Sequence, residues 1–170
     1  MSQRFSRLAA WPMTWLALAA FGTLLQLIAL YYQYGLDYGP CVLCIHVRMW
    51  VALLVLLALV AAALCRWRVP RVALLIGSIG VCGALTERAW QLVATERGWT
   101  IGSCDMVSGL PDWVPLERWF PSLFQIQESC GYTPDMPWGL TMGESLLGLF
   151  AAMTLALVPL LPGAFRHPVR

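Results

Sequence analysis

Two cysteines three residues apart, Cys41 and Cys44, follow Pro40 where a loop meets a long apolar run. Thiols at this spacing can close a small ring, whose strain makes the disulfide easier to reduce than a structural one. If the apolar run is a helix, its first turn offers unpaired N–H groups and a partial positive charge, which favour a thiolate. The pattern therefore predicts a redox-active dithiol, with a purely structural bridge as the alternative.

Charged side chains occur inside the apolar runs. Arg48 follows Cys44 by four residues, so on a helix the two side chains share a face one turn apart. A charge at mid-membrane costs about 2.5–3.5 kcal/mol on insertion scales, and snorkelling to the headgroups is the alternative to a functional role. We interpret Arg48 as a functional cation that stabilises a thiolate or polarises a carbonyl. Arg88 lies at a similar depth in a later run, whereas we expect Glu144 to snorkel.

Four further cysteines complete the set. Cys104 and Cys130 are separated by 25 residues of a long stretch rich in Pro, Gly and Trp, and a bridge between them would by itself be a structural element. Beside a second dithiol in the same compartment, we interpret that bridge as an exchangeable disulfide that a partner's thiolate can attack. Cys65 and Cys82 lie at the edge of or inside apolar runs, and we assign them no function.

Metal binding fits the dithiol poorly. Haem attachment requires a histidine directly after the second cysteine, but Ile45 follows Cys44 and His46 comes one residue later. A zinc site built from Cys41, Cys44 and His46 has no evident fourth ligand, and zinc thiolates suit a reducing compartment. We therefore expect no metal at this site.

The composition determines the environment of these groups. Of the 170 residues, 59% are hydrophobic and only 12% are charged, against about 45–50% and about 25% in ordinary soluble domains. Such a chain could not cover itself with polar surface, which excludes a soluble globular fold. Eleven arginines, no lysines and nine acidic residues give a net charge of +2 without a basic stripe, which excludes a nucleic-acid binder.

Four apolar runs are long enough to cross a hydrocarbon core of about 30 Å as helices. They do not alternate polar and apolar residues as spanning strands do. The first run continues too far for a cleaved signal peptide. We therefore expect an all-α membrane protein, a four-helix transmembrane bundle forming one integral-membrane domain over residues 1–170. The expected crossings are about 13–31, 42–64, 69–93 and 140–161.

The charges predict the orientation of the bundle. Seven arginines and no carboxylate fall on one side, and all nine acidic residues fall on the other side or at its membrane boundary. Because basic residues stay in the cytoplasm, both termini are expected there, and loops of about 32–41 and 94–139 face outward. Aromatic and charged residues mix over 113–120, which predicts a short helix on the outer membrane surface, with an irregular loop as the alternative. Disulfides persist in that outer compartment.

The chain resembles the DsbB family of bacterial inner-membrane disulfide-forming proteins over nearly its whole length. The resemblance rests on the four crossings, the loop sizes and the residues Pro40-Cys41-Val42-Leu43-Cys44, Arg48, Cys104-Asp105 and Cys130. It implies reoxidation of a periplasmic DsbA-like thioredoxin-fold protein by disulfide exchange. It also implies transfer of two electrons to membrane quinone, either ubiquinone or menaquinone.

The resemblance also implies a role for each residue. The partner attacks Cys104, forms a mixed disulfide there and frees Cys130. Exchange with Cys41 then moves the electrons to the pair Cys41 and Cys44. Cys44 engages the quinone as a thiolate, and Arg48 lies beside the quinone headgroup.

The chain departs from the family pattern at His46, where members often carry an aromatic residue, and at Val47, where they often carry an acidic one. Arg88 is carried over as a quinone-facing residue, although its helix is shifted in register against the loop. Two other protein classes fit part of the pattern. A vitamin-K-epoxide-type reductase has its dithiol near the end of the bundle, and a non-catalytic four-span scaffold would carry two structural disulfides.

Overall fold

The computed structural model of the chain describes residues 8–100, 116–128, 133–134, 136 and 139–165. Within these residues, four helices are long and apolar enough to cross a membrane, which confirms the predicted all-α fold with four crossings. They are α2 (Pro12–Gly35), α3 (Val42–Leu64), α4 (Arg68–Glu96) and α7 (Met142–Leu157), the last continued by η1 (Val158–Leu160) and α8 (Leu161–Ala164).

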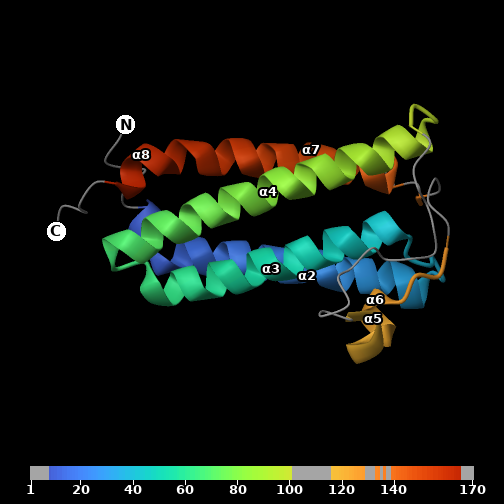
Figure 1. The fold of residues 1–170 in the computed structure, drawn as a ribbon, viewed down its shortest axis with the longest axis horizontal. Helices are drawn as coiled ribbons and strands as arrows, with labels where there is room; N and C mark the ends of the chain where they lie inside the picture. Colours follow the sequence, from blue (N-terminus) through green and yellow to red (C-terminus); the bar gives the residue numbers. More distant parts are fainter. Residues whose placement is uncertain (1–7, 101–115, 129–132, 135, 137–138, 166–170) are drawn as a thin grey trace.

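The long helices lie side by side along the long axis of the molecule (Figure 1). Helix α2 packs against α3, α3 against α4, and α4 against α7. Successive helices run in opposite directions, so the start of α2 and the end of α8 lie at the same end of the bundle (Figure 1). The end of α2, the start of α3, the end of α4 and the start of α7 lie at the other end, which we call the dithiol end. Two short helices, α5 (Leu116–Trp119) and α6 (Pro121–Phe124), also lie at the dithiol end.

Local chemistry explains where α7 begins and ends. Thr141 Oγ1 accepts a hydrogen bond from the backbone N–H of Glu144, and the Glu144 carboxylate accepts one from the backbone N–H of Thr141. This capping box satisfies N–H groups that the first turn leaves unpaired. Glu144 also forms an ion pair with Arg97, so it caps a helix and joins α4 to α7 where the sequence predicts a snorkelling residue. Pro159 and Pro162 follow the end of α7, where proline disrupts regular helical hydrogen bonding.

Among the described residues, the buried core forms two clusters, one in each half of the bundle. The cluster nearer the dithiol end contains Leu54, Cys82, Leu85 and Phe150 among its eight residues. The cluster at the opposite end contains Trp15, Cys65 and Leu75 among its nine residues. Both core cysteines are therefore packed among apolar side chains. At the end opposite the dithiol, buried Arg71 donates hydrogen bonds to the carbonyl oxygens of Cys65 and Ala164. These bonds link the end of α3 to α8.

The outward segments differ in length from the sequence interpretation. Helix α2 extends past the apolar run 13–31 and ends at Gly35, so residues 32–35 are helical where the sequence predicts the start of the first loop. The predicted surface segment 113–120 contains α5, whereas residues 113–115 lie outside the described residues. Trp119 and Phe120 are exposed. The location of this segment on a membrane surface, like the orientation of the termini, stays a prediction.

Gly22 on α2 marks a close approach to α3, since a Cβ at this position would lie 2.6 Å from Val55 Cγ2. Small residues at such contacts allow membrane helices to approach each other. We expect Gly22→Ala to lower the thermal unfolding midpoint of the purified protein by several degrees, because overpacking costs about 1–3 kcal/mol. The control is Gly80→Ala on α4, where an added Cβ meets nothing within 4 Å. Equal midpoints for the two variants would contradict this packing.

Candidate functional site

The dithiol lies at the N-terminal end of α3. Cys41 is the N-cap residue, with φ −83° and ψ 171°, and its sulfur accepts a hydrogen bond from the backbone N–H of Cys44 at 3.4 Å. The two sulfur atoms are 2.8 Å apart, and a disulfide bond is about 2.05 Å long. Closing the bond therefore needs only a small movement. The helix N-terminus supplies the N–H groups and partial charge that stabilise a thiolate here.

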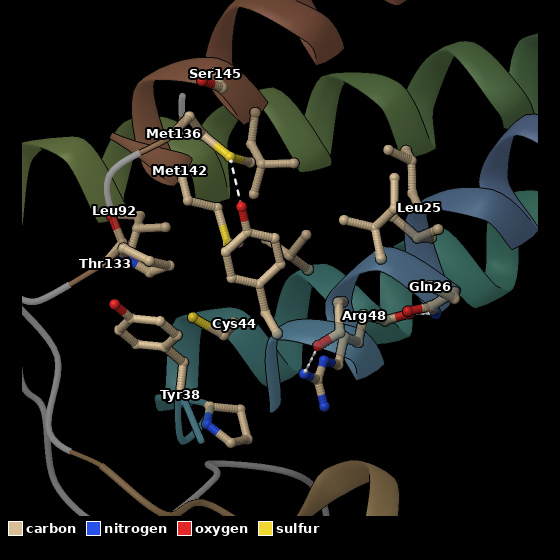
Figure 2. A pocket seen from close by; sticks show the side chains of 18 of the residues that line it. Leu25, Gln26, Tyr38, Cys44, Arg48, Leu92, Thr133, Met136, Met142 and Ser145 are labelled. Carbon is tan, nitrogen blue, oxygen red and sulfur yellow. Dashed lines mark hydrogen bonds between the residues drawn. The ribbon is translucent and has the colours of Figure 1, made fainter. Parts of the chain in front are cut away.

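A cavity of about 370 Å³ lies beside Cys44 (Figure 2). This volume falls within the range of about 300–1,000 Å³ that is typical of small-molecule sites. Helices α2, α3, α4 and α7 form its walls together with residues that return from the second loop. Most lining side chains are apolar, among them Leu25, Val47, Leu92, Met142, Leu146 and Phe150. The polar lining residues include Gln26, Tyr32, Tyr38, Thr133 and Ser145. The cavity therefore fits an apolar molecule that carries a few polar atoms.

Arg48 borders this cavity one helical turn from Cys44, and its side chain is buried, with 8% of the residue exposed. Its Nη1 atom donates hydrogen bonds to Gln33 Oε1 at 2.6 Å and to the Leu123 carbonyl oxygen at 3.1 Å. Its Nη2 atom donates to the Ala29 carbonyl oxygen at 3.1 Å. A buried charge is tolerated only when hydrogen bonds replace its hydration. The guanidinium therefore holds α2, α3 and α6 together.

The second loop packs against the residues that precede the dithiol. Buried Gln33 donates a hydrogen bond from Nε2 to the Ser122 carbonyl oxygen at 3.4 Å. The backbone N–H of Gln127 donates to the Pro40 carbonyl oxygen at 3.1 Å. A Cβ at Gly39 would lie 2.9 Å from the Cβ of Gln127, so the absence of a side chain permits this contact. Residues 121–128 thus lie against the first loop directly before Cys41.

The structure brings three of the predicted site residues together, namely Cys41, Cys44 and Arg48. Arg88 donates a hydrogen bond to Gln91 on its own helix at 3.0 Å, and it is not among the residues that line the cavity. Its assignment to the quinone site stays a prediction. Cys104 and Cys130 lie outside the described residues. In the described part of the chain, no three His, Cys, Asp or Glu side chains form a group that could hold a metal ion.

Sequence analysis did not identify two glutamines that support the site. Gln26 donates a hydrogen bond from Nε2 to the Arg48 carbonyl oxygen at 2.7 Å, and Gln33 accepts from the Arg48 side chain. The two are seven residues apart on α2, so they share one helix face. Polar residues on one face of a membrane helix indicate that this face contacts protein, and this spacing was the available signal.

A dithiol at a helix end, beside an apolar cavity in a four-helix membrane bundle, defines a membrane thiol oxidoreductase with a lipid-soluble second substrate. Residues 11–160 match the family described as "Disulfide bond formation protein DsbB". The chain therefore belongs to the DsbB family, and it is a quinone-linked thiol oxidoreductase of the bacterial inner membrane. Membership of the DsbB family excludes the two alternative protein classes, the non-catalytic four-span scaffold and the vitamin-K-epoxide-type reductase.

Curated relatives are similar along most of their length. Disulfide bond formation protein B 2 of Pseudomonas aeruginosa is 35% identical over 149 residues, which cover 84% of this chain and 86% of the relative. Disulfide bond formation protein B of Shewanella sp. (strain MR-4) is 30% identical over 171 residues, 94% of each chain. The Yersinia pestis (strain Pestoides F) protein of the same name is 30% identical over an alignment of 178 positions, which covers 100% of this chain and 97% of the relative.

The two core cysteines provide a test of the site. Cys65 and Cys82 are buried in the core and are not among the residues that line the cavity. We expect Cys65→Ala and Cys82→Ala to retain the wild-type rate of quinone-dependent thiol oxidation, because each removes only a packing group. Cys44→Ser, measured in parallel, should abolish that rate. Loss of turnover in either core variant, with the protein still folded, would show that the core cysteines take part in the reaction.

Proposed function

We propose that Cys41, Cys44, Cys104 and Cys130 form a relay that reoxidises a periplasmic DsbA-like thioredoxin-fold protein and passes its two electrons to membrane quinone. One observation carries the proposal. Cys44 lies on the wall of the apolar cavity while its sulfur is 2.8 Å from that of Cys41. One end of the dithiol is thus open to a lipid-soluble acceptor, and Cys41, which is buried and adjacent, is its disulfide partner.

The first exchange takes place in the second loop. A thiolate of the reduced partner attacks Cys104 in the bridge between Cys104 and Cys130, forming a mixed disulfide and releasing the Cys130 thiolate. The partner's second thiolate then displaces Cys104, so the partner leaves oxidised and the loop pair is left as a dithiol. The packing of residues 121–128 against Gly39 and Pro40 supports this role, because this part of the second loop contacts the residues directly before Cys41.

The second exchange moves the electrons to the helix end. The Cys130 thiolate attacks Cys41 in the bridge between Cys41 and Cys44, and Cys44 leaves as a thiolate. The Cys104 thiolate then restores the loop bridge and releases Cys41. The result is an oxidised loop pair and a reduced dithiol at the start of α3, where the helix terminus and the nearby guanidinium of Arg48 stabilise the Cys44 thiolate.

The cavity residues fit a quinone, whose flat ring carries two carbonyl oxygens on an apolar body. We propose ubiquinone as the acceptor, with menaquinone as the alternative. When bound, the quinone accepts two electrons and two protons, which restores the bridge between Cys41 and Cys44. The acceptor must have a higher potential than a DsbA-like protein, whose potential is near −120 mV. The apolar side chains exclude water, and Arg48 provides positive charge at the border of the cavity.

We further propose that the dithiol end faces the periplasm and that both termini are cytoplasmic. Arg66, between α3 and α4, and Arg68 and Arg71, in the first turn of α4, lie at the end opposite the dithiol. The helix-borne carboxylates Glu96 and Glu144 lie at the dithiol end. This asymmetry supports the orientation, because basic residues remain on the cytoplasmic side. The segment over 113–120 would then lie on the outer membrane face.

A trapping experiment tests the first exchange. We expect a partner with a single active-site cysteine to form a stable covalent adduct with Cys130→Ser. In this variant the Cys104 thiolate displaces Cys44 from Cys41, and the partner's thiolate then attacks Cys104 in the new bridge and releases Cys41. The resulting mixed disulfide on Cys104 persists because the partner has no second thiol to resolve it. Mass spectrometry of the peptides locates the adduct. Cys104→Ser serves as the control and should form none. An adduct on Cys41 in both variants would show that the partner bypasses the loop pair.

The kinetics of Arg48 variants test the transfer of electrons from the dithiol to quinone. We expect Arg48→Ala to raise the KM for quinone about 10- to 100-fold, as loss of charge-assisted hydrogen bonds does, and to change the KM for the reduced partner much less. Steady-state rates with each substrate varied in turn provide the measurement. Gln33→Ala is the matched variant, since it keeps the charge but removes one acceptor of Arg48. If Gln33→Ala reproduced the full effect, Arg48 would act by holding the second loop and not through its charge.

A further inference from the structure

One wall of the cavity is formed by the chain that returns from the second loop to α7. Thr133, Pro134, Met136 and Met142 all line the cavity. The described residues of this return segment, 133–134, 136 and 139–142, fold back on one another. The backbone N–H of Met136 donates to the Leu140 carbonyl oxygen at 2.8 Å, and that of Met142 donates to the Pro134 carbonyl oxygen at 3.0 Å. The shape of the cavity therefore depends on where the return segment is held.

The return segment is held by Glu96, the last residue of α4. Its Oε1 atom accepts a hydrogen bond from the Thr133 hydroxyl, and its Oε2 atom accepts one from the Thr141 hydroxyl at 3.0 Å. One carboxylate thus binds the segment near both of its ends. Leu92, one turn earlier on the same face of α4, is itself a lining residue. Glu96 therefore fixes the wall segment to the helix that forms the neighbouring wall.

The Glu96 carboxylate lies between the end of α4 and the first turn of α7. A negative charge at the C-terminal end of a helix is unfavourable, whereas the first turn of a helix favours one. The Glu96 carboxylate lies against the first turn of α7, where a Cβ at Gly143 would be 3.0 Å from Oε2. The missing side chain at position 143 leaves room for the carboxylate. Thr133 is only 7% exposed, so water does not readily replace Glu96 as the partner of its hydroxyl.

We propose that Glu96 is a positioning residue for the acceptor site: its carboxylate fixes the return segment against α4 and thereby sets the shape of the cavity beside Cys44. The inference rests on the proposed function, because it takes this cavity as the quinone site. Glu96 is not a lining residue, so it acts through Thr133 and Thr141. The hydrogen bond between Thr133 and Glu96 also anchors the chain three residues after Cys130.

The test compares four variants of the full-length protein in lipid nanodiscs, using a short-chain ubiquinone and a reduced DsbA-like partner. Glu96→Ala removes both hydrogen bonds. Thr133→Val removes one of them, together with the hydrogen bond that the Thr133 hydroxyl accepts from the backbone N–H of Gly143, and leaves the Thr141–Glu144 capping box in place. Glu96→Gln keeps an acceptor and adds a donor that can serve the second hydroxyl. Glu87→Ala is the control, since it removes a carboxylate from an exposed position on the same helix. The readouts are the KM for quinone, the KM for the partner, kcat, and the rise in unfolding midpoint that the quinone causes.

We expect Glu96→Ala to raise the KM for quinone about tenfold, the effect of losing two hydrogen bonds of ordinary strength, while kcat and the KM for the partner stay near the wild-type values. The quinone should also raise its unfolding midpoint less. Thr133→Val should raise the KM about threefold, because it removes one of the two hydrogen bonds between Glu96 and the return segment and leaves the other. Glu96→Gln and Glu87→Ala should resemble the wild type.

A KM for quinone in Glu96→Ala equal to that in Glu87→Ala would overturn the inference. If Glu96→Ala does not fold, Thr133→Val decides, and a wild-type KM in that variant overturns the inference. Failure of the proposed function is recognised separately in the wild-type protein. In that case the wild type would show neither saturable quinone-dependent oxidation nor a quinone-induced rise in its midpoint.

Discussion

A guanidinium inside an apolar bundle must find its hydrogen-bond acceptors within the protein, because lipid provides none. Arg48 finds them on α2, at Ala29 and Gln33, and in the second loop, at Leu123. These acceptors lie far apart in the sequence, yet one buried charge requires all of them at the same place. The requirement brings the second loop to the N-terminal end of α3, one turn from Cys44. The dithiol, its cavity and the loop that carries the other cysteine pair therefore occupy one end of the bundle.

The same arrangement separates two chemical tasks. Exchange between disulfides needs access from water, and the proposed function assigns this exchange to the cysteines of the second loop. Electron transfer to quinone needs an apolar site, and the proposed function assigns this transfer to the apolar cavity between α2, α3, α4 and α7. Cys41 and Cys44 connect the two because they lie where loop and helix meet, with the Cys41 N-cap stabilised by the first turn of α3. Cys65 and Cys82 belong to the packed core and are not part of this connection.

The sequence predicted those features of the fold and the site that depend on a single segment of the chain. Uninterrupted apolar runs predicted four helices, and a spacing of four residues predicted that Arg48 lies one turn from Cys44. It was silent where the structure depends on contacts between distant segments. The seven-residue spacing of Gln26 and Gln33 indicates a protein-facing side of α2, but no local period pairs Gln33 with Arg48 or Glu96 with Thr133, because only tertiary packing joins them. Arg88 shows the same limit, because its depth along α4 could be counted, whereas the direction of its side chain depends on how α4 is rotated against its neighbours.

Photoaffinity labelling with a quinone analogue tests most directly whether the cavity beside Cys44 is the acceptor site. The account predicts that the label attaches to cavity residues such as Val47 on α3 and Leu146 on α7, and that unlabelled quinone suppresses this attachment. The structure also contains a smaller cavity of about 220 Å³ at the opposite end, lined by Trp15, Leu18 and Leu160 among others. Competable labelling confined to that second cavity, with none beside Cys44, would contradict the account.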